Sequence, residues 1–422
     1  MLVLVAGLLA KRKLNSRMRV LHVNVRLLEG GAAGVTRDLH LALIRAGIDS
    51  RFAYGWGERG GPSSIEKFIP NSFQVGAQVQ VATNIVSHRI FGIDVLKPFG
   101  ESEKRLAEAI KWSDVIHLHV IHSYFAPYKW FFDLIFNEKK PIVWTAHDYW
   151  MLTGRCAFTE GCRNWLEGCG KCPTQKNYPP SHMDFSGHEF QAKRRIINRL
   201  GTKLHFVAPT SFVAEELKIG YPNLTVDVIP NWLDEEFNTA LNMSPLSKST
   251  LCIAHTEQIK VLVVANDLSD HGKVDPSVIT QLQKIPYIEI HTVGSNSPFI
   301  ASNVINHGKI VQRIKMVEVM KASDVALFTS EKDTFGLVMI EALACGTPVL
   351  AVNSLAAKEV LEAVGITPVT DKSAIVDYLA TRTLPDCYKS FETHSLQKKV
   401  VSIYDQAFAI SRYIEIYKKL CG

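Results

Sequence analysis

The sequence predicts a protein of two α/β domains, each built on a parallel sheet flanked by helices. Stretches typical of buried strands alternate with stretches of helical periodicity along the whole chain, which favours parallel sheets with crossover helices. A polar segment at 242–258 separates two such series and is expected to be the linker. At 422 residues the chain is long enough for two domains with sizeable cores.

The first domain is expected to span residues 18–241. Its first strand, Val20–Asn24, leads into the glycine-rich loop 29–34 and a helix that ends near Gly47. The further strands predicted in this domain are Asp114–His119, Pro141–Thr145, Leu204–Ala208 and Val226–Pro230.

The second domain is expected to span residues 259–395, with a separate helical pattern over 396–422. Its predicted strands are Ile259–Val264, Ile288–Val293, Asp324–Phe328 and Val349–Val352. No repeat is visible in the sequence, although the two halves are expected to share one architecture.

Residues 1–17 hold an apolar run too short to span a bilayer, and their basic residues follow it, the wrong order for a secretory signal. We interpret them as an extension ahead of a start at Met18, with a short membrane-surface anchor as the alternative. No other segment approaches transmembrane length, so a cytoplasmic protein is expected. The net charge of +6 suits a basic cleft for diphosphates or an anionic membrane surface, and is too small to indicate nucleic acid.

The most informative segment is 330–350, where two carboxylates, Asp333 and Glu341, flank the pair Phe335-Gly336. The pattern indicates a loop, a helix that stops at Gly346, and another strand. A glycine at a loop-to-helix junction lets backbone N–H groups approach a phosphate, whose charge the helix N-terminus favours. Because carboxylates accept hydrogen bonds from sugar hydroxyls, the arrangement suits a nucleotide-sugar. A buried βαβ unit with solvated acids is the alternative.

This segment resembles the acidic-x7-acidic signature of retaining glycosyltransferases in the large bacterial group 1 family, which is similar to family 4 (GT4). That family usually has Glu where this chain has Asp333, although some members share Asp-Thr-Phe-Gly. The resemblance implies the GT-B fold: two Rossmann-like, doubly wound domains facing a central cleft, with the last helix crossing back to the first domain. It implies that Asp333 binds the transferred sugar and Glu341 the ribose. The phosphates would lie on the backbone N–H groups of Phe335, Gly336, Leu337 and Val338.

On the donor side, the resembled family places an Arg and then a Lys after the first strand of the second domain, where they offset the charge of the leaving diphosphate. Lys273 matches the Lys, with a solvated surface side chain as the alternative, whereas Asn266 or Asp267 fills the Arg position. Gly294 ends a strand and would face the base or ribose. Since lysine charge and backbone dipoles would replace a divalent metal, no catalytic cofactor is expected.

On the acceptor side, the loop that begins at Arg26 and contains Gly30 and Gly31 resembles the family's first glycine-rich loop, which closes over the diphosphate. Arg26 is expected to add the missing cation near Asp267. The alternative is a structural turn.

Histidines follow two of the predicted strands. The resemblance places His119 beside the anomeric carbon, because it ends its strand, whereas His117 is expected to be packed in the core. His122 is a further candidate. His147 and Asp148 end the next strand, where Asp148 would orient His147 or accept a proton from the acceptor hydroxyl.

Four of the eight cysteines lie in the loop 153–180, at Cys156, Cys162, Cys169 and Cys172. A cytoplasmic protein is not expected to keep disulfides there. The last pair has the short spacing of a zinc knuckle, so we predict a structural zinc site, with redox-active or free thiols as the alternative.

The run 144–180 and the segment NVRLLEGGAAGV further resemble glycosyltransferases of colanic acid biosynthesis in enteric bacteria, over nearly the whole chain from Met18. This implies a hexosyltransferase of exopolysaccharide biosynthesis, with a UDP- or GDP-sugar donor and an undecaprenyl-diphosphate-linked saccharide acceptor, peripheral at the inner membrane face. The alternatives are a nucleotide-sugar epimerase on the same fold and a catalytically inactive GT-B scaffold subunit. A zinc-dependent nucleic-acid module is disfavoured, because charges of both signs surround the cysteines.

Overall fold

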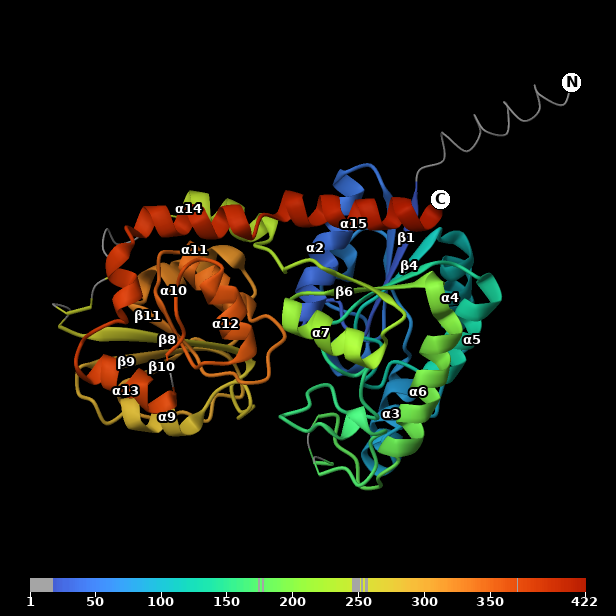
Figure 1. Ribbon diagram of the computed structural model, residues 1–422, viewed down its shortest axis with the longest axis horizontal. Coiled ribbons are helices and arrows are strands. Elements are labelled where there is room, and N and C mark those ends of the chain that lie inside the picture. The colour runs from blue at the N-terminus through green and yellow to red at the C-terminus, as the bar shows by residue number, and fades with distance from the viewer. Residues whose placement is uncertain are drawn as a thin grey trace, which may run out of the picture.

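The computed structural model describes residues 18–173, 175–176, 178–244, 251, 253–254, 257–369 and 371–422. Residues 1–17, interpreted above as an extension, and most of the predicted linker therefore lie outside the described residues. Two α/β domains stand side by side, and a pair of helices at the end of the chain runs along one edge of both (Figure 1).

The first domain is built on a parallel sheet of seven described strands, in the order β3-β2-β1-β4-β5-β6-β7. The chain winds outward from β1 in both directions, so that Val20 lies between Ser50 of β2 and Val115 of β4. The strands are β1 Arg19–Asn24, β2 Asp49–Tyr54, β3 Ser72–Gln74, β4 Val115–Leu118, β5 Ile142–Thr145, β6 Leu204–Ala208 and β7 Thr225–Val228.

The second domain repeats this winding around a sheet of five described strands, in the order β10-β9-β8-β11-β12, again all parallel. The strands are β8 Ile259–Asp267, β9 Ile288–Ser295, β10 Val304–Asn306, β11 Val325–Phe328 and β12 Val349–Ala351. The predicted fold, two doubly wound domains, is confirmed. The sequence analysis missed β2, β3 and β10. β3 and β10 are edge strands of three residues, which carry too little periodicity to be recognised.

Helices cover both faces of the first sheet because successive strand residues point to opposite sides. Val20 of β1 packs on the layer formed by α2 and the last helix, whereas Leu21 packs toward α4, α5, α6 and α7. The helices of this domain are α2 Gly31–Arg45, α3 Gln78–Phe91, α4 Glu101–Trp112, α5 Tyr128–Glu138, α6 Ser186–Leu200 and α7 Ser211–Gly220. Those that follow are α8 Glu235–Met243, α9 Pro276–Leu282, α10 Arg313–Ala322, α11 Leu337–Ala344, α12 Leu355–Glu362, α13 Lys372–Ala380, α14 Thr393–Ile403 and α15 Gln406–Cys421.

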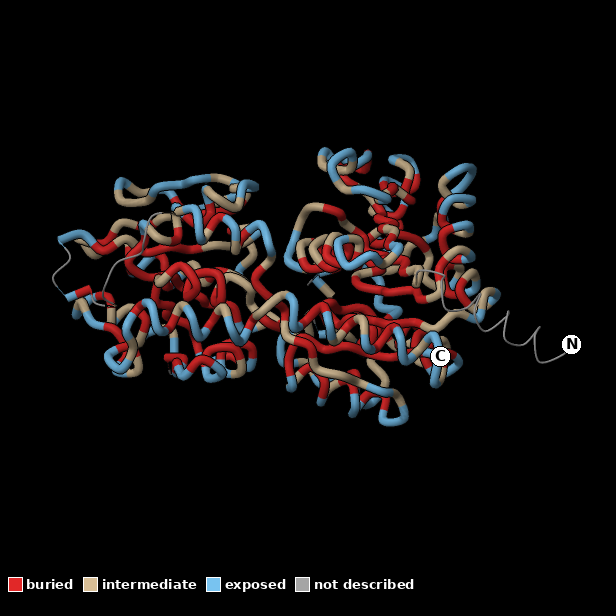
Figure 2. The backbone as a smooth tube through the Cα atoms, turned by 90° about the horizontal axis from the view of Figure 1, so that it is seen from above, coloured by how far each residue is buried: buried red, intermediate tan, exposed pale blue. Residues whose placement is uncertain are grey.

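The chain passes into the second domain earlier than the sequence analysis expected. Trp232 belongs to the core of the first domain, whereas Leu233 and Phe237 belong to the core of the second. The chain therefore crosses between the domains at residues 232–233, and the prediction of the linker at 242–258 is wrong. The polar composition there misled the prediction, because the true crossing is a short buried segment without a loop-like sequence. Figure 2 shows the two separate buried cores.

The return crossing also differs from the prediction. The helical pattern expected over 396–422 is two helices, with a break at Tyr404 and Asp405. Leu396 and Val400 of α14 remain in the core of the second domain, whereas Tyr413 and Tyr417 of α15 pack on the first. The second domain thus extends to Tyr404, and only α15 crosses back. Among the described helices, none is both long and apolar enough to span a bilayer.

The docking of α15 depends on a buried tyrosine. Tyr417 is 0% exposed, and its hydroxyl lies 2.6 Å from Nδ1 of His117 in β4. Replacing Tyr417 with Ala is expected to lower the free energy of unfolding by about 3–5 kcal/mol, since it leaves a cavity and an unpaired imidazole. Urea unfolding measures the change. The control Lys418→Ala, on the exposed side of the same helix, should change stability by less than about 0.5 kcal/mol.

Candidate active site

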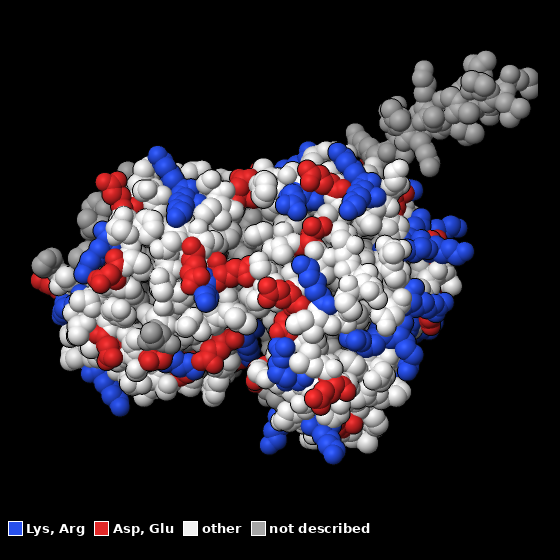
Figure 3. Space-filling view, viewed as in Figure 1, with Lys and Arg blue, Asp and Glu red and all other residues white. Residues whose placement is uncertain are grey.

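A deep cleft lies between the two domains and takes its walls from both. Its volume is about 460 Å³. Figure 3 shows the two lobes of the molecule, with a notch between them at the lower edge. The lining of the cleft includes the loop after β1, the ends of β8 and β9, and the first residues of α10 and α11. Of the residues predicted from the sequence, the cleft brings together Gly30, Gly31, Gly294, Leu337, Val338 and Glu341.

The start of α11 is shaped by Gly336. This residue caps the helix with φ 84° and ψ 65°, a left-handed conformation that a side chain would strain. A Cβ there would also lie 2.7 Å from both the Phe328 ring and the Met339 methyl carbon. The close packing places the N-terminus of α11, with Leu337 and Val338, directly at the cleft wall. Phe335 instead points inward and is 3% exposed.

Opposite this helix lies the start of α2, where Gly30 has φ 90°. A Cβ on Gly31 would lie 3.7 Å from the Leu337 methyl group across the domain boundary. Two helix N-termini, one from each domain, therefore border the same cleft. Their unpaired N–H groups and dipoles make this part of the cleft attractive to anions.

The far wall of the cleft is built on close backbone contacts. Gly294 ends β9 with φ 151°, and a Cβ there would lie 2.0 Å from the Ala265 carbonyl oxygen. Its N–H donates to the Gly308 carbonyl at 2.9 Å. Only glycine fits this position. Gly294 lines the cleft, and its predicted role of facing the base or ribose stays a prediction. Asn266, expected at the missing arginine position, also lines the cleft.

Glu341 lies on α11 and is held by a cation that the sequence analysis missed. Arg313 donates to Glu341 Oε1 at 3.1 Å and also pairs with Asp234. Burial raises the pKa of Glu341, while Arg313 opposes that effect. Burial lowers the pKa of Arg313, but Glu341 and Asp234 together outweigh it and raise that pKa. A permanent cation thus stands in the cleft beside a buried carboxylate.

Other polar groups of this wall were also missed. Arg37 of α2 lines the cleft, where burial and the nearby Arg313 lower its pKa. Asp38 accepts hydrogen bonds from Trp232 and from Gln406, the latter at 2.7 Å, and so ties α2 to both domain crossings. Nothing in local sequence spacing connects these residues. The one sequence feature that could have indicated a role for Arg313 is its position at the start of the helix that follows the turn at Gly308.

Lys273 and Asp333, both predicted to be catalytic, form an ion pair with one another. Their side chains are 28% and 18% exposed. Asp333 lines a second cavity, between the donor-domain loop and the cysteine-rich loop, rather than the larger cleft. The pair therefore stands at the side of the site that faces loop 153–180.

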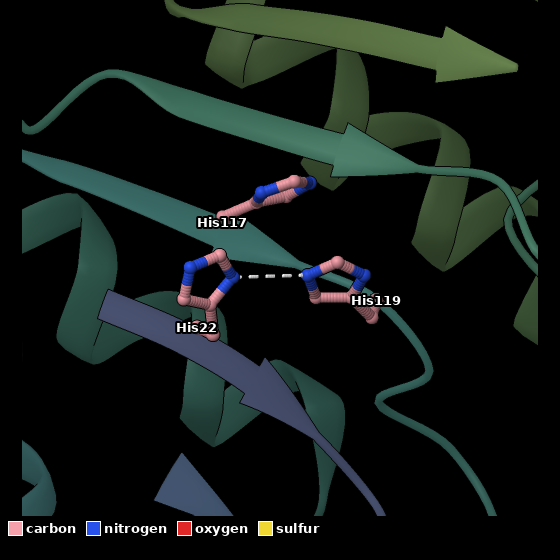
Figure 4. Close-up of side chains that lie close together, drawn as sticks. All are labelled: His22, His117 and His119. Carbon is pink, nitrogen blue, oxygen red and sulfur yellow. Dashed lines mark hydrogen bonds between the residues drawn. The ribbon is translucent and has the colours of Figure 1, made fainter. Parts of the chain in front are cut away.

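Three histidines of the first domain form a hydrogen-bonded line that ends at His147. His22 Nδ1 lies 3.2 Å from His119 Nε2, and His119 Nδ1 lies 2.9 Å from His147 Nε2. Figure 4 shows the contact between His22 and His119. Burial holds the pKa of His22 and His119 well below the usual range and lowers that of His147 to about 4, so all three are neutral near pH 7.

The direction of this line follows from its buried end. Nε2 of His22 has no hydrogen-bond partner, so a proton there would be a buried donor without an acceptor. His22 therefore donates from Nδ1 to His119, and His119 donates from Nδ1 to His147. His147 keeps its own proton on Nδ1. His119 is 2% exposed and both its nitrogens are occupied, whereas His147, at the other end of the line, is partly exposed. The prediction of His119 as a direct contact is corrected accordingly.

Asp148 does not orient His147 as predicted. Its carboxylate lies 2.8 Å from Nε2 of His122 and accepts the N–H of Trp150 at 2.9 Å. Burial tends to raise the pKa of Asp148, but His122 and the hydrogen bonds outweigh it and lower that pKa. His147 and Asp148 are adjacent in the sequence, so their side chains leave the backbone in different directions.

His22, His117 and His119 are the one group of described residues whose potential metal-ligand atoms all lie within 4.8 Å of one another. The arrangement does not fit a metal ion. The rings of His117 and His119 overlap at a centroid distance of 4.1 Å with 30° between their planes, so their lone pairs do not converge. Both nitrogens of His117 are already occupied, by Tyr417 and Thr145. His117 is a packed core residue, as expected.

Arg26 does not supply the cation expected near Asp267. It forms a two-point ion pair with Glu29, at 2.9 and 2.7 Å, and stacks 3.7 Å above the ring of Trp56. The Trp56 ring lies 6.3 Å from that of Tyr124. Ser123 and Tyr124 both have positive φ, at 66° and 74°, a strained conformation common at functional sites. An aromatic and cationic surface therefore lies on the first domain beside the histidines.

Comparison with known proteins identifies this architecture. Residues 29–237 match the model of Glycosyltransferase Family 4, and residues 300–381 match Glycosyl transferases group 1. The putative colanic acid biosynthesis glycosyl transferase WcaC of Escherichia coli (strain K12) is 35% identical over 365 residues, 85% of this chain and 89% of that protein.

Solved structures share the fold at low identity. Anabaena Alr3699/HepE, in complex with UDP and glucose, is 15% identical with a TM-score of 0.60, covering 96% of this chain and 100% of that one. Sucrose-phosphate synthase from Thermosynechococcus elongatus is 15% identical with a TM-score of 0.59, covering 96% and 99%.

The neutral histidine line predicts a loss of stability in mild acid. The unfolded chain binds protons at these histidines below about pH 6.5, whereas folded His147 binds one only near pH 4. The free energy of unfolding should therefore fall between about pH 7.5 and about pH 5.5, by up to about 1.4 kcal/mol per pH unit for each histidine. Urea unfolding measures this slope.

Two variants test whether the buried histidine line causes the pH dependence of the free energy of unfolding. His119→Gln should reduce the pH slope, whereas the exposed His394→Gln should leave it unchanged. A stability that stays flat or rises on acidification would contradict the assignment of neutral buried rings.

Proposed function

The chain belongs to the group 1 glycosyltransferases, and from that premise we propose that it transfers a hexose from a nucleotide-sugar to a lipid-linked saccharide with retention at the anomeric carbon. The observation that carries the donor assignment is the N-terminus of α11 at the cleft wall, with Glu341 inside the same helix. Alr3699/HepE, which has the same fold, was solved with UDP and glucose.

The donor is proposed to lie along the wall of the second domain. The diphosphate would accept hydrogen bonds from the backbone N–H groups of residues 335–338, where the helix dipole favours its charge. Glu341 would accept hydrogen bonds from the ribose, and the base would lie near Gly294. Arg313 supplies the cation that the sequence lacks at position 266, because its guanidinium stands beside Glu341 in the cleft.

The transfer itself requires positioning and charge rather than a protein nucleophile. The acceptor hydroxyl attacks the anomeric carbon from the face that the diphosphate leaves, and the diphosphate takes the proton. Lys273 and the helix N-terminus stabilise the charge that grows on the leaving group. Asp333 holds the sugar, and the N–H of His147 Nδ1 is available to a sugar hydroxyl. We expect no divalent metal to be needed, since cations and dipoles already offset the diphosphate.

A lipid-linked acceptor would bring the first domain to a membrane surface. An apolar patch suited to this contact consists of Val86, Ile90 and Phe91 of α3 with Met183, which are 59%, 40%, 40% and 44% exposed. The two segments adjoin, because the N–H of Met183 donates to the Ile90 carbonyl at 2.9 Å. Arg89 lies exposed within the patch and can contact anionic lipid headgroups. The proposed acceptor belongs to an exopolysaccharide of the colanic acid type, by similarity to WcaC.

Substitution of the donor-binding groups tests the reaction. Glu341→Ala and Lys273→Ala should each lower turnover at least about tenfold, equivalent to about 1.4 kcal/mol of transition-state stabilisation. Release of UDP or GDP from a panel of nucleotide-sugars, with a prenyl-diphosphate-linked saccharide as acceptor, measures turnover. NMR of the product gives the anomeric configuration.

The exposed Glu362→Ala is the matched control and should retain full activity. Turnover should also persist in EDTA. If both site variants keep the wild-type rate, the donor site lies elsewhere. If the wild-type protein releases no nucleotide from any donor, an inactive scaffold is favoured instead.

The membrane contact is tested separately by flotation with vesicles of phosphatidylethanolamine and phosphatidylglycerol. The wild-type protein should float with the vesicles, and the double variant Ile90→Asp, Met183→Asp should lose at least about 1 kcal/mol of binding, roughly fivefold. Ile300→Asp, at a residue 93% exposed on the second domain, serves as the control and should float like the wild type. Equal flotation of all three proteins would exclude this patch.

A further inference from the structure

The loop 153–180, called the cysteine loop from here on, is a long insertion between β5 and α6. Of its described residues, only Asn164–Leu166 form regular structure, a single 3-10 turn. The loop lies at the lower end of the first domain in Figure 1. Trp165 is 3% exposed, and the Cys156 side chain is also buried. Such a segment has too little apolar surface to fix its own shape and needs another source of order.

Four cysteines supply a common interior for this loop. Cys156, Cys162, Cys169 and Cys172 all line one small cavity of about 20 Å³. They come from both halves of the loop, so a group bound between them would close the loop on itself. No cysteine from the rest of the described chain lines this cavity.

The second pair of cysteines lies on a tight backbone reversal. Four consecutive residues, 168–171, have positive φ, with values of 115°, 59°, 89° and 50°. Two of them, Cys169 and Lys171, are not glycine, and each costs of the order of 1–3 kcal/mol in this conformation. The N–H of Gly154 donates to Cys169 Sγ at 3.2 Å and so ties the reversal to the start of the loop. The reversal places the sulfurs of Cys169 and Cys172 at the same cavity. A strained backbone of this kind is kept where surrounding contacts or a bound group stabilise it.

Basic side chains stand beside the cavity. Arg155, only 4% exposed, has its guanidinium 3.9 Å from Cys172 Sγ. Lys193 of α6, 3% exposed, donates to the Trp150 carbonyl at 2.6 Å, and the negative groups that act on it are Glu189 first, then Cys169 and Cys156. A metal ion with charge +2 held by four thiolates has a net charge near −2, which nearby basic side chains would partly offset.

We propose that Cys156, Cys162, Cys169 and Cys172 bind one Zn²⁺ as a closed, structural site. Thiolate sulfur is the ligand that Zn²⁺ prefers, and four of them leave no position open for catalysis. No three of the four sulfurs lie within 4.8 Å of one another, whereas Zn–S bonds are about 2.3 Å long. Binding therefore draws them inward, by rotation of the side chains about the cavity.

The site would order more than the loop itself. Phe158 of the cysteine loop lies between two lysines of the second domain, with Lys273 Nζ 5.1 Å and Lys332 Nζ 5.6 Å from its ring centre. Lys332 also approaches Glu160 at 3.7 Å. Since Lys273 pairs with Asp333, the loop that zinc would hold is in contact with the groups proposed to act on the donor. This positioning role rests on the proposed function, whereas the zinc site does not.

Metal analysis of the full-length protein, purified without added zinc or chelator, tests the site. The wild type should contain about one zinc per chain by elemental mass spectrometry. Cys169→Ser and Cys172→Ser should each lose most of it. Cys421→Ser, at an exposed position outside the cavity, is the control and should keep it.

A second measurement avoids variants that fail to fold. Titration of the wild type with an organomercurial should release about one zinc as four thiols react, followed with a chromogenic chelator. Wild-type protein without zinc, or with disulfides among these four cysteines by thiol counting, would overturn the proposal. Retention of zinc in both serine variants would overturn it as well.

The positioning role has its own readout. Phe158→Ala should keep its zinc but lower kcat at least about threefold with little change in KM for the donor, because it removes the contact with Lys273 and no cysteine. Wild-type kinetics in this variant would remove the positioning role. Zinc in an otherwise inactive protein would instead contradict the proposed function and leave the metal site standing.

Discussion

Thr334 fixes the geometry on which the candidate site depends. Its hydroxyl donates to the His147 carbonyl at 2.9 Å, and its carbonyl accepts a hydrogen bond from the Thr210 hydroxyl at 3.0 Å. Thr334 lies two residues before Gly336, at the start of α11, whereas the other two residues end strands of the first domain. One buried residue therefore sets the distance between the N-terminal end of α11 and the histidine line.

The cations of the candidate site are already paired with carboxylates, so a ligand would replace existing partners. Arg313 pairs with Glu341 and Asp234 in the cleft, and Lys273 pairs with Asp333 beside the second cavity. Each cation stays charged in a partly buried site because a carboxylate accompanies it. A diphosphate that draws the cations away frees those carboxylates to accept hydrogen bonds from sugar hydroxyls. In the proposed complex, the cations of these pairs would contact the diphosphate of a nucleotide-sugar, and the carboxylates would contact the hydroxyl groups of its two sugars.

The sequence was sufficient for features that are local in the chain. The strand alternation, the turn at Gly336 and the helix carrying Glu341 all follow from patterns within about twenty residues. The features it could not provide arise from tertiary contacts between distant residues. Arg313 meets Asp234 across 79 positions, and Asp148 meets His122 across 26, with no spacing rule to indicate either pair. The domain crossing at Trp232 was missed for a related reason, because buried crossings have the composition of core rather than of linker.

The return helix shows why the second domain cannot be regarded as an independent unit attached to the first. Tyr417 contacts His117, and the Tyr413 hydroxyl lies 3.2 Å from that of Thr145, two residues before His147. α15 follows α14 after a single break, and α14 packs on α11. The strand that ends at His147 is thus linked to α11 twice, directly through Thr334 and indirectly through the two helices. A change in the angle between the domains must alter at least one of these links, so the relative position of donor and acceptor groups is a property of the whole chain.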